Sequence, residues 1–275
     1  MTANRLWPLA GASITLDSGL ITMGHHGTLS VPIPTFLIEH DRGLVLFDTG
    51  LAPEAWNDPR SVYGDLVDVF ALDCPPGNTL ELQIQKCGFE LSDITHVVIS
   101  HSHFDHTGGM YLFPDAEFYM SEVDLRYAFW PDPPYRGFYR TQDLELTRSF
   151  KWNPLREDYD LFGDGSLVIY QTPGHTPGEV SLLVKLPSRS FLITGDSVHL
   201  RSGLESECPC PVDVNAIQTV QSIQRIKQIS ASLQAEIWVL HDRTTGNGSA
   251  MSKAATSDDA APANSSSRGR SSERE

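Results

Sequence analysis

The chain has 275 residues, 40% of them hydrophobic, and a formal net charge of −15 at pH 7. This length and composition support a sizeable core, and the negative charge disfavours nucleic acid and anionic membranes as partners. No apolar run approaches the ~18 residues of a membrane span, and the N-terminus does not resemble a signal peptide, so a cytoplasmic protein is expected. The cysteines have no zinc-knuckle or redox-pair spacing, which favours free thiols at Cys74, Cys87, Cys208 and Cys210.

Apolar runs bounded by turn residues predict the secondary structure in chain order. Strands are expected at 30–38, 43–48, 95–100 and 116–120, with a short helix at 78–88. Further strands are expected at 166–172, 179–186, 190–196 and 235–240. A helix at 213–234 precedes the last strand, and its apolar stripe comprises Ile217, Val220, Ile223, Ile226 and Ile229. One such helix cannot cover this many strands, so we expect layered sheets with helices outside.

Two segments differ from this pattern. Residues 121–160 mix aromatic side chains with prolines and charges, which predicts a lid-like insertion that lines a pocket or, alternatively, a surface insertion packed for stability. Residues 244–275 are rich in Ser, Ala, Thr and charged residues and have few large apolar side chains, which predicts a disordered polar tail. Residues 1–243 are therefore expected to form the folded domain.

The densest polar pattern follows the strand expected at 95–100. The stretch SHSHFDHTGG places His101, His103, Asp105 and His106 within six positions. Burying four such groups without partners at a strand end would be costly, and nothing in folding alone rewards it. Imidazole nitrogens and carboxylate oxygens are ligands of Zn²⁺ and neighbouring transition metals. The pattern therefore predicts a metal site.

Further ligand-type residues occur at later strand ends. His175 lies in TPGHTPG, Asp196 follows FLITG, and His241 follows AEIWVL. A dinuclear centre needs about three protein ligands per ion and a bridging group. This need is met if one ion takes His101, His103 and His175, the other takes Asp105, His106 and His241, and Asp196 bridges the two. We expect the ligand imidazoles to donate their second N–H to carboxylates or carbonyls, with Asp48 as one such partner.

These motifs resemble the HxHxDH signature and the later ligand motifs of the metallo-β-lactamase superfamily, in the same order. The resemblance spans about residues 20–243, and Phe47-Asp48-Thr49-Gly50 is similar to the family's early DTG turn. It implies an α/β fold of the αββα four-layer sandwich type, with residues 1–243 as a metallo-β-lactamase-like catalytic domain, and usually a hydrolase. The seven predicted ligands match the family's metal positions one by one.

Within the superfamily, the stretches VPIPTFLIEHDRGLVLFDTG and EVDLRYAFWPDP resemble the N-acyl homoserine lactone lactonases, which are quorum-quenching enzymes. This implies a dinuclear hydrolase that opens a lactone ring by attack of a metal-bridging hydroxide. The expected cofactors are two Zn²⁺ ions, with Mn, Fe or Co as alternatives. Asp105 is a candidate proton carrier to the leaving alkoxide. The family's Tyr three residues after the bridging Asp is replaced here by His199, which could donate a hydrogen bond to the substrate oxyanion.

Several alternatives stay open from the sequence. The first is hydrolysis of a lactam, a cyclic carbamate or a thioester on the same fold, and another is a non-catalytic metal-binding protein. The expected partner is a small-molecule lactone or lactam, and the expected assembly is a monomer or a homodimer. Class B β-lactamases fit less well because they often use a cysteine ligand, and ribonuclease-type members need a basic face. Glyoxalase II fits less well because it carries a helical C-terminal region.

Overall fold

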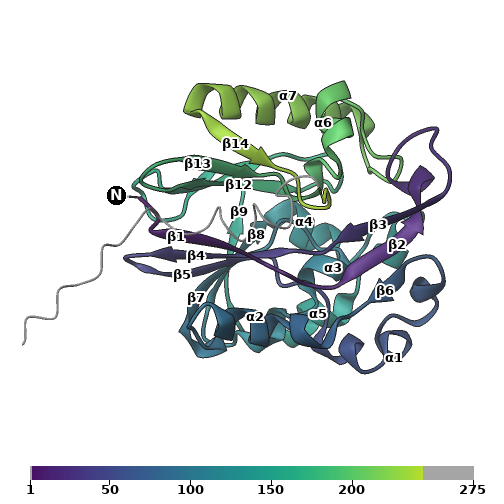
Figure 1. The fold of residues 1–275 in the computed structure, drawn as a ribbon, viewed down its shortest axis with the longest axis horizontal. Helices are drawn as coiled ribbons and strands as arrows, with labels where there is room; N and C mark the ends of the chain where they lie inside the picture. The colour runs from purple at the N-terminus through teal and green to yellow at the C-terminus, as the bar shows by residue number, and fades with distance from the viewer. Residues whose placement is uncertain (1, 244–275) are drawn as a thin grey trace, which may run out of the picture.

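The computed structural model describes residues 2–243, and the tail predicted at 244–275 lies outside the described residues. Within that range, α-helices enclose two large sheets, and a third, smaller sheet lies at one end (Figure 1). The 3₁₀ turns are η1 (Ser18–Leu20), η2 (Pro53–Trp56), η3 (Gly64–Asp68), η4 (Pro76–Asn78), η5 (Leu91–Asp93), η6 (Met110–Leu112), η7 (Arg136–Phe138) and η8 (Gly195–Ser197).

The six-stranded sheet has the order β1-β4-β5-β7-β8-β9. Its strands β1, β4 and β5 pair antiparallel, and β5, β7, β8 and β9 pair parallel. The strands are β1 (Arg5–Leu9), β4 (Thr35–His40), β5 (Gly43–Phe47), β7 (Ile94–Val98), β8 (Glu117–Ser121) and β9 (Lys151–Leu155). The helices in this part of the chain are α1 (Pro59–Tyr63), α2 (Leu80–Lys86), α3 (Phe104–Thr107), α4 (Glu122–Tyr127) and α5 (Thr141–Leu146).

The second sheet has five strands in the order β10-β11-β12-β13-β14, of which only β13 and β14 pair parallel. These are β10 (Tyr159–Asp160), β11 (Leu167–Gln171), β12 (Val180–Lys185), β13 (Ser190–Ile193) and β14 (Ala235–Trp238), accompanied by helices α6 (Arg201–Ser206) and α7 (Ala216–Leu233). The small third sheet has the order β3-β2-β6, with β2 (Ser13–Asp17), β3 (Thr28–Pro32) and β6 (Ala71–Asp73).

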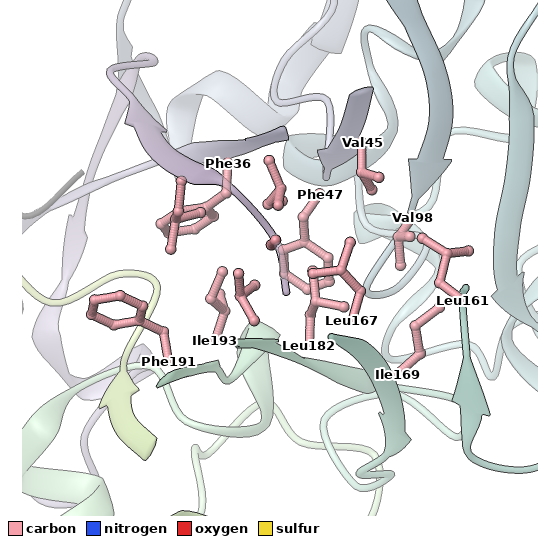
Figure 2. Close-up of a cluster of buried hydrophobic side chains, with 14 of the residues drawn as sticks. Phe36, Val45, Phe47, Val98, Leu161, Leu167, Ile169, Leu182, Phe191 and Ile193 are labelled. Carbon is pink, nitrogen blue, oxygen red and sulfur yellow. The ribbon is translucent and has the colours of Figure 1, made fainter. Parts of the chain in front are cut away.

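The main core lies between the two large sheets (Figure 2). Successive side chains of a strand point to opposite faces, so Phe36 and Ile38 of β4 enter this core while Leu37 between them faces the other side of the sheet. The five-stranded sheet contributes the facing side chains, among them Leu167, Ile169, Leu182, Phe191 and Ile193. Both sheets are therefore buried on their inner faces.

Helices cover the outer face of each large sheet. Ile223 and Ile226 of α7 pack with Leu183 of β12 and Leu192 of β13. On the other side, Ile84 of α2 and Leu144 of α5 belong to one cluster with side chains from β5, β7 and β8. The order helix, sheet, sheet, helix is visible in Figure 1, and it confirms the predicted αββα sandwich.

Two element predictions were wrong in part. The strand predicted at 30–38 is two strands, β3 and β4, which belong to different sheets. The break falls at Ile33 and Pro34, because Ile33 donates its backbone N–H to Ala12 and a proline has none to offer. The predicted stripe of α7 also includes Ile217, but this side chain is 74% exposed, whereas Ile223 and Ile226 of the same stripe are buried.

The segment 121–160 contributes to the sheet as well as to the surface. Its strand β9 is the edge strand beside β8, and α4 and α5 lie within it. Its aromatic side chains divide accordingly: Tyr139 is buried, whereas Trp130 is 87% exposed. Among the described residues, no helix combines the length and apolar character needed to cross a membrane.

Candidate metal centre

The residues predicted as ligands come from loops that follow strand ends. His101 lies three residues after β7, and His103 directly precedes α3, which carries Asp105 and His106. His175 lies between β11 and β12. Strands β13 and β14 run parallel, so their carboxyl ends meet at one edge, where Asp196 in η8 and His241 lie close together. The sheet topology thus gathers groups that are distant in sequence.

All seven predicted ligands are buried and lie within one cluster. One ligand atom from each of His101, His103 and His175 lies within 4.8 Å of the other two, and the same holds for Asp105, His106 and His241. These are the two groups expected from the sequence.

Asp196 lies between these two groups. Its Oδ2 atom is 3.6 Å from Nε2 of His175 and 3.5 Å from Nε2 of His106, which belong to different groups. Its Oδ1 atom is 3.1 Å from Nε2 of His241. A carboxylate in this position can contact both groups at once, as a bridging group must.

Buried polar atoms without partners support a metal ion at this place. In the described part of the chain, Nε2 of His101 and of His106 is buried and makes no hydrogen bond, and Nδ1 of His103 lies 3.0 Å from Nε2 of His175. Such atoms are costly in a folded protein unless a ligand satisfies them. Nitrogen and carboxylate donors facing one space fit a transition-metal ion, so the residues present suit the group that the motif implies.

Carboxylate and carbonyl oxygens bind the Nδ1 nitrogen of three of the ligand imidazoles. Nδ1 of His106 lies 2.9 Å from Oδ2 of Asp48, and Nδ1 of His175 lies 2.9 Å from Oδ1 of Asp213. Nδ1 of His241 lies 2.7 Å from the carbonyl oxygen of Pro32. In each pair the imidazole N–H donates, which leaves the Nε2 lone pair directed at the cluster. The expected contact with Asp48 is therefore present.

Sequence reasoning missed Asp213 and Glu179, whose types and spacing carry no recognisable motif. Glu179 is fully buried, its Oε2 lies 3.1 Å from Nδ1 of His101, and its Oε1 accepts the backbone N–H of Asp196 at 3.0 Å. Gly195 makes room for this contact, because a Cβ atom there would lie 2.1 Å from Oε1 of Glu179. Its φ of 56° also favours glycine.

Burial and neighbouring charges set the protonation of these groups. Burial lowers the pKa of His101 and of His103 well below the usual histidine value, and nearby imidazoles lower it further. At His106 burial acts in the same direction, but the neighbouring carboxylates outweigh it and raise the pKa well above the usual value. Burial has the opposite effect on a carboxyl group and raises the pKa of Glu179 well above its usual value. Neutral imidazoles are the form in which histidine binds metal ions.

A pocket of about 60 Å³ opens over the cluster. Six of the predicted site residues line it: the predicted ligands His103, Asp105, His175, Asp196 and His241, and His199. The remaining walls are apolar and come mainly from the small sheet, η1 and nearby loops: Ile14, Leu16, Leu20, Ile21, Val31, Phe70, Phe104, Phe138 and Val212. From the aromatic residues of 127–139, only Phe138 is among these lining residues.

Comparisons with known proteins identify the family. The model of the metallo-beta-lactamase superfamily matches residues 30–234. N-acyl homoserine lactonase AttM from Rhizobium radiobacter is 35% identical over 251 residues, which cover 88% of this chain and 94% of that protein.

Two solved structures are similar in fold. One is an N-acyl homoserine lactone hydrolase with the product N-hexanoyl-L-homoserine at its catalytic metal centre; it has a TM-score of 0.79, 23% identity, and coverage of 90% of this chain and 97% of that chain. The other is the dizinc quorum-quenching lactonase AidC, with a TM-score of 0.68, 17% identity, and coverage of 88% and 90%. The family match, the fold and the cluster together show that the chain belongs to the metallo-beta-lactamase superfamily.

Proposed function

We propose that this protein is a metal-dependent hydrolase that opens the ring of N-acyl homoserine lactones. One observation carries the proposal: five residues of the seven-residue cluster line a pocket whose other walls, apart from His199, are apolar. The similarity to the lactonase AttM over 88% of the chain supports the same substrate class. A lactone ring carries the polar carbonyl that must reach the cluster, and an acyl chain is the apolar part that such walls favour.

Two metal ions are proposed at the cluster, with Zn²⁺ as the expected ion. His101, His103 and His175 would hold one ion, Asp105, His106 and His241 would hold the other, and Asp196 would contact both. When bound, such ions polarise a carbonyl and lower the pKa of water so that hydroxide is available near neutral pH. Asp48 and Asp213 would keep His106 and His175 in the orientation that this binding requires.

Two side chains are proposed to act on the substrate directly. Asp105 faces the pocket, and its Oδ2 lies 3.6 Å from Nε2 of His106, so its second oxygen can carry a proton to the leaving alkoxide. His199 also faces the pocket and lies beside Asp196, with Nε2 3.3 Å from Oδ2. An imidazole N–H there can donate to the lactone carbonyl oxygen and stabilise the charge that develops on it.

The assay of choice follows ring opening of N-hexanoyl homoserine lactone by acid release, with the metal-loaded protein. We expect turnover by the wild type, and we expect His103→Ala to lose both turnover and bound metal. The matched control is His26→Ala, which removes an exposed imidazole outside the cluster and should retain both properties. Unchanged turnover in His103→Ala would contradict the proposal.

The role of His199 needs a separate test. His199→Tyr keeps a hydrogen-bond donor but changes its reach, so we expect altered relative rates across lactones of different ring and chain size. Metal content should stay the same because His199 is not among the proposed ligands. Identical relative rates across the panel would remove His199 from the substrate site.

A further inference from the structure

A second and larger cavity, of about 510 Å³, adjoins the substrate pocket and shares Ile21 and His199 with it. Five soft donor side chains line this cavity: Met23, His25, His199, Cys208 and Cys210. Thioether, thiolate and imidazole groups are the ligands that thiophilic metal ions prefer. The proposed lactone hydrolysis uses only His199 of these five.

Two of these donor residues, His199 and Cys210, lie close to the carboxylate of Asp213. His199, Cys210 and Asp213 each offer a ligand atom within 4.8 Å of the other two, and all three residues are buried. A tight turn fixes two of them: the backbone N–H of Cys210 donates to Oδ2 of Asp213 at 2.8 Å, and the backbone N–H of Asp213 donates to the carbonyl oxygen of Cys210 at 3.1 Å. The thiol of Cys210 also donates to the carbonyl oxygen of Leu20, at 3.2 Å.

We propose that His199, Cys210 and Asp213 form a third metal site, which binds a thiophilic divalent ion such as Zn²⁺. This site adjoins the dinuclear cluster, because Oδ1 of Asp213 lies 2.9 Å from Nδ1 of His175 and Nε2 of His199 lies 3.3 Å from Oδ2 of Asp196. One imidazole nitrogen, one thiolate sulfur and one carboxylate oxygen make a donor set typical of Zn²⁺, and water can complete the coordination from the cavity. Binding converts the thiol of Cys210 to the thiolate and releases its proton to solvent. The sulfur ligand distinguishes this site, because the dinuclear cluster contains no cysteine.

The position of the third metal site predicts an effect on lactone turnover. His199 lines both cavities, so an ion that engages its imidazole removes it from the substrate pocket. A third equivalent of metal therefore inhibits lactone turnover, a consequence that rests on the proposed function and on the role of His199 within it. The ion reaches Cys210 through the larger cavity and does not have to pass through the substrate pocket.

Cobalt titration of the protein loaded with two equivalents of Zn²⁺ tests the site. Co²⁺ bound to a thiolate gives a near-ultraviolet charge-transfer band, which imidazole and carboxylate ligands do not give. We expect the band to develop with one equivalent in the wild type and in Cys87→Ser, a control with a cysteine removed beside α2. We expect it to be lost in Cys210→Ser. No band in the wild type, or an undiminished band in Cys210→Ser, would overturn the proposal.

A second measurement uses the wild type, so it does not depend on the folding of any variant. Alkylation of Cys210, mapped by mass spectrometry, should be unaffected by the first two equivalents of Zn²⁺ and suppressed by the third. Alkylation that stays constant through the third equivalent overturns the proposal. Lactone turnover at two equivalents of Zn²⁺ without the later cobalt band refutes only the third site, whereas the cobalt band in a protein that shows no turnover at two equivalents of Zn²⁺ refutes only the proposed hydrolase.

Discussion

Nδ1 of His106 lies 2.9 Å from Oδ2 of Asp48, a residue 58 positions earlier in the chain. Asp48 also accepts the backbone N–H of Ser100 at 2.7 Å, so one carboxylate joins the end of β5 to the loop that carries the first ligands. Its backbone has φ of 60°, a left-handed conformation that is uncommon outside glycine. This carboxylate fixes the direction in which the imidazole of His106 points.

The contact predicts the behaviour of Asp48→Asn. Asparagine tolerates the left-handed conformation, so the fold should persist, but a neutral amide accepts the N–H of His106 more weakly. We expect metal affinity to fall by about 10- to 100-fold. Competition with a chromophoric chelator measures this, and Asp115→Asn, which changes an exposed carboxylate outside the cluster, serves as the control. Equal metal affinities in Asp48→Asn and in the control variant would show that Asp48 does not support the site.

The apolar pocket predicts how the enzyme discriminates acyl chains. Phe138 lines the pocket, so Phe138→Ala removes apolar surface that a long chain would contact. We expect kcat/KM for an N-decanoyl substrate to fall by about tenfold, and that for an N-butanoyl substrate to change little. Phe129→Ala is the matched control, because Phe129 lies in the same segment but is 43% exposed. Equal losses for both chain lengths would place the acyl chain elsewhere.

The ion pairs of Asp164, a residue outside the metal cluster, predict that the free energy of unfolding depends on pH. Asp164 accepts hydrogen bonds from Arg42 and from the backbone of Ser166, and it lies 3.2 Å from Nε2 of His40. Burial opposes the charge, but the hydrogen bonds from Ser166 and Arg42 lower the pKa of Asp164 well below its usual value. The folded state therefore favours the ionised carboxylate.

The sign of the effect follows from linkage. A carboxyl group whose pKa is lower in the folded state stabilises the fold above its unfolded pKa, near 3.9, and this contribution is lost as the pH falls further. We expect Asp164→Asn to reduce the free energy of unfolding by about 1–2 kcal/mol at pH 7. Urea unfolding should show the difference from the wild type narrowing below about pH 5. The exposed Asp115→Asn is the control, and a gap that widens in acid would contradict the account.

Much of the sandwich could be predicted from the sequence, because buried strands have continuous runs of apolar residues. The run at 95–100 corresponds to β7, and the runs at 166–172 and 179–186 correspond to β11 and β12. The strands β1, β2, β6, β9 and β10 were not predicted. Some of them contain a proline or only three residues, as in RLWPL and ALD, so neither alternation nor length sets them apart from loops.

In the candidate site, the residues that belong to sequence motifs could be predicted, whereas the residues that only support them could not. His101, His103, Asp105 and His106 stand out because four ligand-type residues occur in six positions, and the structure brings His175, Asp196 and His241 to them. Glu179 and Asp213 support the imidazoles but carry no sequence signal, because their partners lie 78 and 38 positions away. Only the folded chain shows such pairs.

The central claim is that two metal ions at this cluster enable lactone hydrolysis, and a metal titration tests it most directly. Metal-free protein would be titrated with Zn²⁺ while ring opening of N-hexanoyl homoserine lactone is followed. The account predicts no turnover without metal and a maximum at two equivalents per chain. Full turnover by the metal-free protein, or a maximum at one equivalent, would contradict it.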